Sequence, residues 1–197
     1  MRIIGTVGLP GSGKGEAAAV AREEDIPVVT MGDVIRAETR RRGLDPTENH
    51  GEIAGKLREE EGETAIADRC IPMVREAAED QSGEPVVLVD GLRSMAEVER
   101  FVDAFGEDFL LVSIEAPFDL RAKRLGARGR EATDLDREKL REREERELGF
   151  GMGEVIDAAD LTIHNDDSLE AFREQVRAVL EAGADAVDEQ HAGGEHE

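Results

Sequence analysis

The chain has 197 residues and a formal net charge of −22, with 47 acidic residues against 25 basic ones. Such a charge argues against nonspecific binding to nucleic acid or to anionic lipid, because their phosphates would be repelled. The length suits one α/β domain with a sizeable core, and the sequence has neither an apolar leader nor an apolar run long enough to cross a membrane.

Cysteine and lysine usage indicate the compartment and the habitat. The single cysteine, Cys70, cannot form an internal disulfide, which agrees with a reducing compartment, so we expect a cytoplasmic protein. Only four of the 25 basic residues are lysine. A surface so rich in acid and poor in lysine resembles that of proteins from salt-accumulating archaea, where salt screens the self-repulsion. The charge is therefore interpreted as a sign of halophilic habitat rather than of substrate.

Five short, nearly continuous apolar runs predict strands over residues 2–7, 27–30, 85–90, 109–115 and 161–164. Helical stretches alternate with them over residues 17–24, 33–42, 64–79, 95–105 and 168–180. Because buried parallel strands have this character, the pattern predicts a three-layer α/β/α fold with a five-stranded parallel sheet. We expect this domain to span residues 1–181 and residues 182–197 to form an acidic disordered tail.

A glycine loop joins the first strand to the first helix, with the sequence Gly8-Leu9-Pro10-Gly11-Ser12-Gly13-Lys14-Gly15. Its glycines allow consecutive N–H groups to point at one phosphate, and the helix dipole adds positive potential there. Lys14 holds the place that reaches the β- and γ-phosphates in a P-loop, although position 15 is Gly where the pattern has Ser or Thr. A turn without a ligand is the alternative, which the strand before and the helix after disfavour. The predicted donor-binding residues are Gly8, Pro10, Gly11, Ser12, Gly13, Lys14, Gly15 and Glu16.

This loop resembles the P-loop of adenylate kinases and other nucleoside monophosphate kinases, except at Glu16, where adenylate kinases carry Thr. The resemblance implies a P-loop kinase fold, with ATP as the donor and Mg²⁺ as a cofactor. It also implies a helical acceptor-binding insertion, over about residues 31–80, and an arginine-rich lid, over about residues 121–150. No residue pattern excludes GTP.

Two carboxylates are candidate magnesium ligands. Asp90 ends an apolar strand, and ligands of open parallel sheets bind beyond the carboxyl ends of the strands, so Asp90 and Lys14 should converge on one crevice. A helix cap is the alternative role for Asp90. Glu16 lies in the first turn of the first helix, where the dipole alone favours a carboxylate. We expect Glu16 to join Asp90 in positioning magnesium.

The acceptor site is predicted after the second strand. The stretch from Thr30 to Arg36 looks like the start of the acceptor region of adenylate kinases, where the residue matching Arg36 holds the acceptor phosphate. Asp33 falls on an acidic residue that lies beside the acceptor hydroxyl in the similar dephospho-coenzyme A and shikimate kinases. A helix cap for Asp33 and a surface charge for Arg36 are the alternatives.

Further acceptor contacts are expected from arginines. Asp90-Gly91-Leu92-Arg93 resembles the Asp-Gly-x-Pro-Arg of adenylate kinases without its proline, which makes Arg93 a phosphate contact. Arg58 and Arg69 offer guanidinium groups suited to anions. His50 is interpreted as structural or exposed, because phosphoryl transfer depends on positioning and charge rather than on a strong base.

The lid is predicted from Arg121, Arg124 and Arg128, whose i, i+3, i+7 spacing puts them on one helix face. In the resemblance, Arg124 and Arg128 neutralise the transferring phosphoryl, as catalytic residues alongside Lys14 and Asp33; a solvated arginine face is the alternative. Residues 134–147 predict a charged helix that residues 149–153, with three glycines, break into a loop.

The end of the domain, residues 159–170, resembles the last strand and helix entry of dephospho-coenzyme A kinases, in which His164 and Asn165 would border the donor base. Turn-and-cap chemistry is an equal alternative. The resemblance spans about residues 2–180. It looks most like an uncharacterised archaeal branch of the adenylate-kinase-like P-loop proteins.

The sequence therefore predicts an ATP-dependent kinase that acts, with Mg²⁺, on a small nucleotide-like acceptor. A nucleotide-dependent switch NTPase with a protein or RNA partner is the alternative, because the P-loop hydroxyl is missing and the acceptor motif is incomplete. The acceptor and the oligomeric state are left open.

Overall fold

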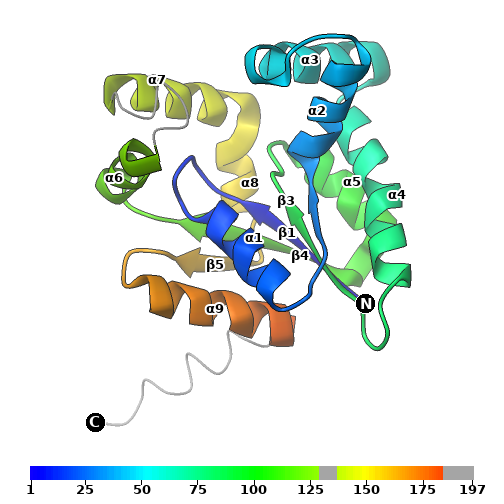
Figure 1. Cartoon of the computed structure of the whole chain (residues 1–197), viewed down its shortest axis with the longest axis vertical. Coiled ribbons are helices and arrows are strands. Elements are labelled where there is room, and N and C mark those ends of the chain that lie inside the picture. Colours follow the sequence, from blue (N-terminus) through cyan, green and yellow to red (C-terminus); the bar gives the residue numbers. More distant parts are fainter. Residues whose placement is uncertain (129–136, 184–197) are drawn as a thin grey trace.

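The computed structural model describes residues 1–128 and 137–183. In these ranges five strands form one parallel sheet in the order β2-β3-β1-β4-β5 (Figure 1). The strands are β1 (Arg2–Val7), β2 (Val28–Thr30), β3 (Val86–Asp90), β4 (Phe109–Glu115) and β5 (Leu161–His164). The predicted sheet is confirmed. Two strands begin one residue later than expected, because Pro27 and Pro85 have no N–H to donate to a ladder.

Helices cover both faces of the sheet, as the predicted three-layer fold requires. They are α1 (Lys14–Glu23), α2 (Met31–Arg41), α3 (Pro46–Glu61), α4 (Ala65–Glu79), α5 (Met95–Phe105), α6 (Phe118–Arg128), α7 (Arg137–Glu147), α8 (Gly153–Asp157) and α9 (Leu169–Ala182). A 3₁₀ turn, η1 (Gly106–Asp108), precedes β4, and a π-helical turn, η3 (Leu148–Met152), joins α7 to α8. No helix within the described ranges has the length and apolar character needed to cross a bilayer.

Two apolar cores lie on opposite faces of the sheet, because successive strand residues point to opposite sides. Ile3 packs into the core beneath α4, α5 and α8, whereas Ile4 packs into the core beneath α1 and α9. Cys70 of α4 is fully buried in the first core. This burial raises the pKa of its thiol to about 12.

Helix α3 was not separately predicted, although its start has clear capping chemistry. The side chain of Asp45 accepts a hydrogen bond of 2.8 Å from the N–H of Thr47, and Pro46 occupies the first turn. Gly62, with a φ of +100°, ends the helix. In Figure 1, α2 and α3 stand above the carboxyl ends of the strands, across from α6 and α7.

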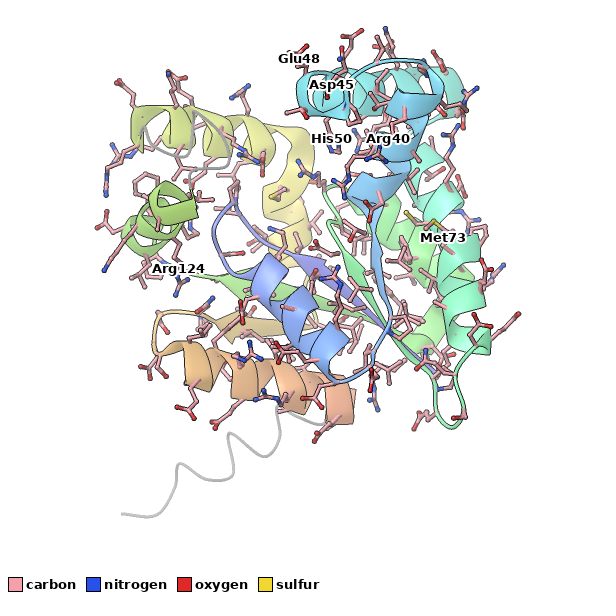
Figure 2. The ribbon with its side chains drawn as sticks, in the orientation of Figure 1. Arg40, Asp45, Glu48, His50, Met73 and Arg124 are labelled. Atoms are coloured by element: carbon pink, nitrogen blue, oxygen red, sulfur yellow. The ribbon has the colours of Figure 1, made fainter. Side chains whose placement is uncertain are left out.

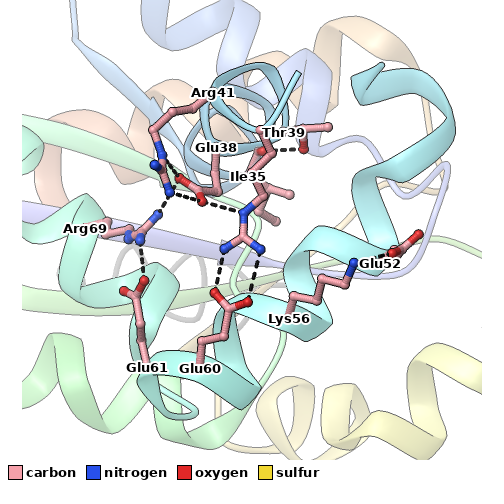
Figure 3. Close-up of polar contacts among 10 residues, drawn as sticks. Ile35, Glu38, Thr39, Arg41, Glu52, Lys56, Glu60, Glu61 and Arg69 are labelled. Atoms are coloured by element: carbon pink, nitrogen blue, oxygen red, sulfur yellow. Dashed lines mark hydrogen bonds and ion pairs between the residues drawn. The ribbon is translucent and has the colours of Figure 1, made fainter. Parts of the chain in front are cut away.

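A buried carboxylate ties α2 to its neighbours (Figure 3). Glu38, 4% exposed, accepts hydrogen bonds from Arg41 at the end of α2 and from Arg42 just after it, and forms an ion pair with Arg69 of α4. Arg42 in turn pairs with Glu60 of α3. The hydrogen bonds from Arg41 and Arg42 lower the pKa of Glu38 to about 2. These contacts make α2, α3 and α4 one connected unit.

The break predicted over residues 149–153 is confirmed only as a kink. Gly151 has a non-helical φ of +95°, but the chain forms the π-helical turn η3 and then α8 rather than a loop. Met152 and Val155 are buried in the first core, and this packing outweighs the poor helix propensity of the glycines. Of the predicted tail, residues 184–197 lie outside the described residues, as do residues 129–136 of the predicted lid.

Candidate functional site

The glycine loop between β1 and α1 is held in a shape that only glycine permits. Gly8 has a φ of +152° and Gly13 a φ of +128°. A Cβ at Gly8 would collide with the carbonyl of Ile114, and one at Gly13 would collide with the amide of Asn165. Since α1 begins at Lys14, its first N–H groups have no partner within the helix and point into the loop. The loop therefore has the backbone geometry of an anion site.

The surroundings of Ser12 and Gly15 show that a phosphate group fits this loop. Ser12 is 1% exposed, and its Oγ is the one buried side-chain oxygen or nitrogen without a hydrogen-bond partner among the described residues. Such an orphan is costly unless a ligand satisfies it. A Cβ at Gly15 would meet no atom within 4 Å. Both observations fit a phosphate group in the loop.

Lys14 lies at the centre of the loop. Its Nζ donates to the carbonyl oxygens of Gly8 and Leu9. Burial lowers the pKa of the amine to about 8, and the negative charge of Asp90 opposes this shift. Lys14 and Asp90 also line one pocket of about 200 Å³. The structure therefore places Lys14 and Asp90 in one crevice, as the sequence predicted.

Asp90 and Glu16 occupy different surroundings. Asp90 ends β3, and its Oδ1 accepts a hydrogen bond of 3.2 Å from Thr6 Oγ1 of β1. Glu16 forms an ion pair with Arg173 of α9 and does not line the pocket that contains Asp90. The residues described include no group of three or more His, Cys, Asp or Glu side chains suited to a metal. A lone carboxylate matches magnesium, which usually takes one or two carboxylates plus substrate phosphates.

A second pocket, of about 310 Å³, adjoins the first. The two pockets share Ile35, His50, Arg58 and Arg93, so they are neighbours, and we call the two together the cleft. The cleft extends from Lys14, past α2 and α3, to the end of α7. His50 (Figure 2), interpreted from sequence as structural, lies near the start of α3 and lines both pockets.

Three arginines predicted to bind the acceptor line the cleft, and each holds a carboxylate. Arg58 pairs with Glu97 at 3.0 Å, and Glu97 is only 1% exposed. Arg93 lies 3.7 Å from Glu147, and its backbone N–H donates to Glu97. Arg36 pairs with Asp33 at 2.6 Å. The guanidinium groups are therefore oriented by carboxylates before any substrate binds.

Asp33 and Arg69 lie outside the cleft. The side chain of Asp33 is 59% exposed, and it lines an outer groove between α2 and α4. Arg69 borders the same groove and pairs with Glu61 at 2.5 Å. The structure thus brings Arg36, Arg58 and Arg93 together with Lys14, whereas it gives Asp33 only an indirect connection, through Arg36.

Arg124 of α6, labelled in Figure 2, is connected to the glycine loop through Asn165. Its guanidinium donates to the backbone carbonyl and to Oδ1 of Asn165, at 3.1 and 3.0 Å. Asn165 Nδ2 donates in turn to the carbonyl of Ser12 at 2.7 Å. Asn165 is therefore tied to the glycine loop, and its place beside a donor base stays a prediction. His164 is exposed at the end of β5, and the side chain of Arg128 lies outside the described part of the chain.

Arg121, predicted from the sequence to lie on the arginine face of the lid, is instead a buried link between elements. It is 5% exposed, pairs with Glu144 of α7 and donates to the carbonyl of Pro10 at 3.3 Å. One side chain thereby joins α6, α7 and the glycine loop. Phe118 packs against the same guanidinium, 5.6 Å from its ring centroid.

Among the arginines of α7, Arg143 is the one whose charge acts on Lys14. It helps to lower the Lys14 pKa, and its Nε donates to Glu147 at 3.1 Å. Glu97 and Glu147 are the site residues that sequence reasoning missed. Glu97 had a signal, because Ser94-x-x-Glu97 is a capping-box spacing and Ser94 does cap α5. No sequence signal distinguished Glu147 from the other charged residues of its helix.

Comparisons with known proteins agree with this geometry. The family model of an AAA domain matches residues 7–141. A UPF0200 protein of Halobacterium salinarum is 54% identical over 182 residues, which cover 92% of this chain and 94% of the relative.

Two solved kinases share the fold at low identity. A gluconokinase from Sinorhizobium meliloti 1021 is 18% identical, with a TM-score of 0.54 over 99% of this chain and 98% of that chain. A shikimate kinase from Acinetobacter baumannii, in complex with shikimate, is 19% identical, with a TM-score of 0.52 over 92% of each chain. These likenesses establish the P-loop kinase fold alone. With its P-loop domain and archaeal relatives, the chain belongs to the UPF0200 family.

Proposed function

We propose that the protein is a small-molecule kinase that transfers the γ-phosphoryl group of ATP to an acceptor bound in the cleft. One observation carries this proposal: Lys14 and Asp90 share a single cleft with Arg36, Arg58 and Arg93. A switch NTPase needs a phosphate loop but no second set of cations beside it. The cleft therefore favours a two-substrate reaction.

On the donor side, Lys14, the loop amides and Ser12 Oγ hold the phosphates of ATP. Asp90 holds magnesium, directly or through water. Bound magnesium supplies charge neutralisation on the β- and γ-phosphates. That Glu16 shares this ion stays a prediction from the sequence, because Glu16 pairs with Arg173 and does not line the pocket that contains Asp90.

On the acceptor side, Arg36, Arg58 and Arg93 bind the anionic part of the acceptor and orient its attacking oxygen. That oxygen forms a bond to the γ-phosphorus while the bond to the β–γ bridging oxygen breaks, and ADP leaves. Arg124, Arg128 and Arg143 are the candidates that stabilise the charge of the transition state. Asp33 stays the predicted base that takes the proton of the acceptor hydroxyl. To do so it would have to leave its ion pair with Arg36.

An acceptor panel tests the proposal. AMP, dephospho-coenzyme A, shikimate and gluconate are each added with ATP and magnesium, and ADP and phosphorylated product are both measured. We expect ADP formation to depend on one acceptor class and to match its product mole for mole. Lys14→Ala serves as the control for contaminating kinases. Hydrolysis that no acceptor changes would overturn the kinase proposal and favour the switch.

A further inference from the structure

One wall of the cleft is built on two glycines inside α3. Gly51 and Gly55 are one turn apart. Together with Ala54, both line the larger of the two pockets that make up the cleft. Glycine is the least favourable residue in a helix interior apart from proline. Two of them within a helix of 16 residues therefore call for a reason.

The fold itself supplies none. Neither Gly51 nor Gly55 is among the described residues with a positive φ, so the backbone does not require glycine. A Cβ at either position would meet no protein atom within 4 Å. In this respect they differ from Gly13, whose conformation and close contacts both exclude a side chain. Alanine at 51 or 55 would fit the protein alone without strain.

What the two glycines preserve is space beside the helix backbone. The pocket that they line is also bordered by Ile35 of α2 and by Met152 of η3. Arg58 lies three residues after Gly55 on the same face of α3, held by Glu97. A molecule bound between these walls can rest directly on α3 while its anionic end reaches Arg58.

We propose that Gly51 and Gly55 determine which acceptors the protein accepts, because they admit a flat, partly apolar body against the backbone of α3. The inference rests on the proposed kinase function and deepens it. Apolar contact comes from Ile35, Ala54 and Met152, and the polar edge of the acceptor faces His50 and Glu63 at the rim of the pocket. Glycine at these positions therefore leaves space for the ligand and lowers the stability of the helix.

The experiment compares Gly51→Ala and Gly55→Ala with the wild-type protein. Each variant should melt about 2–4 °C higher, since alanine favours the helix and no protein atom obstructs it. Each should also raise the KM for the acceptor about tenfold or more, because one added methyl group closes part of the pocket, while the KM for ATP stays within about twofold. AMP, dephospho-coenzyme A, shikimate and gluconate are the probes.

Glu59→Ala is the matched control. Glu59 is exposed near the end of α3 and lines neither pocket, so alanine there stabilises the helix without entering the cleft. If the acceptor KM is unchanged in this control but raised in the glycine variants, the added methyl groups act by filling the pocket and not by stiffening α3.

Three outcomes would overturn the inference. Glycine variants that keep the wild-type KM for the acceptor would exclude a size-determining role while leaving the kinase proposal intact. Variants that melt lower than wild type would show that the fold requires the glycines. A wild-type protein that neither binds nor phosphorylates any of the four probes would overturn the proposed function, and this inference with it.

Discussion

The glycine loop and the acceptor cleft lie side by side, yet they are built by different means. The loop is a backbone structure, whose shape follows from positive φ angles at Gly8 and Gly13 and onto which the side chain of Lys14 folds back. The cleft is a side-chain structure, in which Arg58 and Arg93 arrive from different elements and are oriented by carboxylates.

Substitutions in the loop and in the cleft should therefore have different effects. Removing a side chain from the loop takes away charge but little packing, so chemistry should suffer more than stability. Removing a member of a buried pair in the acceptor region leaves an unpaired charge behind, which costs stability as well. Substitutions on the two sides should therefore separate activity from folding.

The largest effect is expected from Lys14→Ala. We expect nucleotide turnover to fall about 100-fold or more, because the cation that meets the transferring phosphates is lost. Product formation by the variant and by wild type, each with and without magnesium, measures this fall in turnover. Turnover that persists in the purified variant would show that the glycine loop does not bind the donor phosphates.

The same residue predicts a pH dependence of stability. The Lys14 pKa falls from 10.5 to about 8 in the folded protein, so the unfolded chain binds more protons between these values. The free energy of unfolding should therefore rise with pH from about 8 to about 10.5. Urea unfolding of wild type and Lys14→Met across this range should show the rise in wild type and its loss in the variant.

Arg36→Ala should weaken acceptor binding without a loss of stability. Its partner Asp33 is largely exposed, so no buried charge is stranded and the melting temperature should change little. The acceptor KM should rise about 10- to 100-fold with the KM for ATP unchanged, since charge-assisted hydrogen bonds of about 1.5–3 kcal/mol are lost. Arg40→Ala is the control, because Arg40 (Figure 2) lies on the same helix but lines only the outer groove. An equal rise of both KM values would mean that the acceptor site is misplaced.

Glu38→Gln should act on stability. We expect a loss of about 1–3 kcal/mol, because Arg41, Arg42 and Arg69 lose their shared carboxylate. The pKa of Glu38 is lowered from 4.5 to about 2 in the folded state. Its stabilisation is therefore complete above about pH 4.5 and is lost as the pH falls towards about 2. Unfolding curves of the variant should lack that part of the acid dependence, whereas those of Glu59→Gln, on the exposed face of α3, should keep it.

The smallest effect is expected from Glu16→Gln. Removal of a partly exposed pair with Arg173 should cost about 0.2–1 kcal/mol. From this contact we expect the magnesium concentration for half-maximal turnover to stay unchanged. A magnesium curve shifted to higher concentration would instead support the sequence hypothesis that Glu16 shares the ion with Asp90.

Much of the fold could be predicted because its signals are local. Apolar runs identify buried strands, and the spacing of Gly8, Gly13 and Lys14 identifies the loop by itself. The break expected at residues 149–153 is a kink at Gly151 rather than a loop, because the burial of Met152 and Val155 keeps the chain helical beyond it. Helix α3 went unassigned although Asp45 and Pro46 mark its start.

The candidate site was predictable only in part. Which arginines enter the cleft follows from the packing of α2, α3 and α7, and no residue pattern encodes it. Asp33 illustrates the limit, because its position beside Arg36 is correct in sequence while its side chain faces the outer groove. Pairing partners such as Glu147 become recognisable only once distant elements are adjacent.

The depth at which Cys70 lies has a practical consequence. Because the thiolate is the reactive form and its pKa is raised to about 12, the native thiol does not compete for maleimide reagents at neutral pH. The chain is thus, in effect, a cysteine-free background for labelling. One dye on an engineered cysteine of α3 and another on α7 would report, by energy transfer between single molecules, how far apart the two walls of the cleft stand as ATP and acceptor are added.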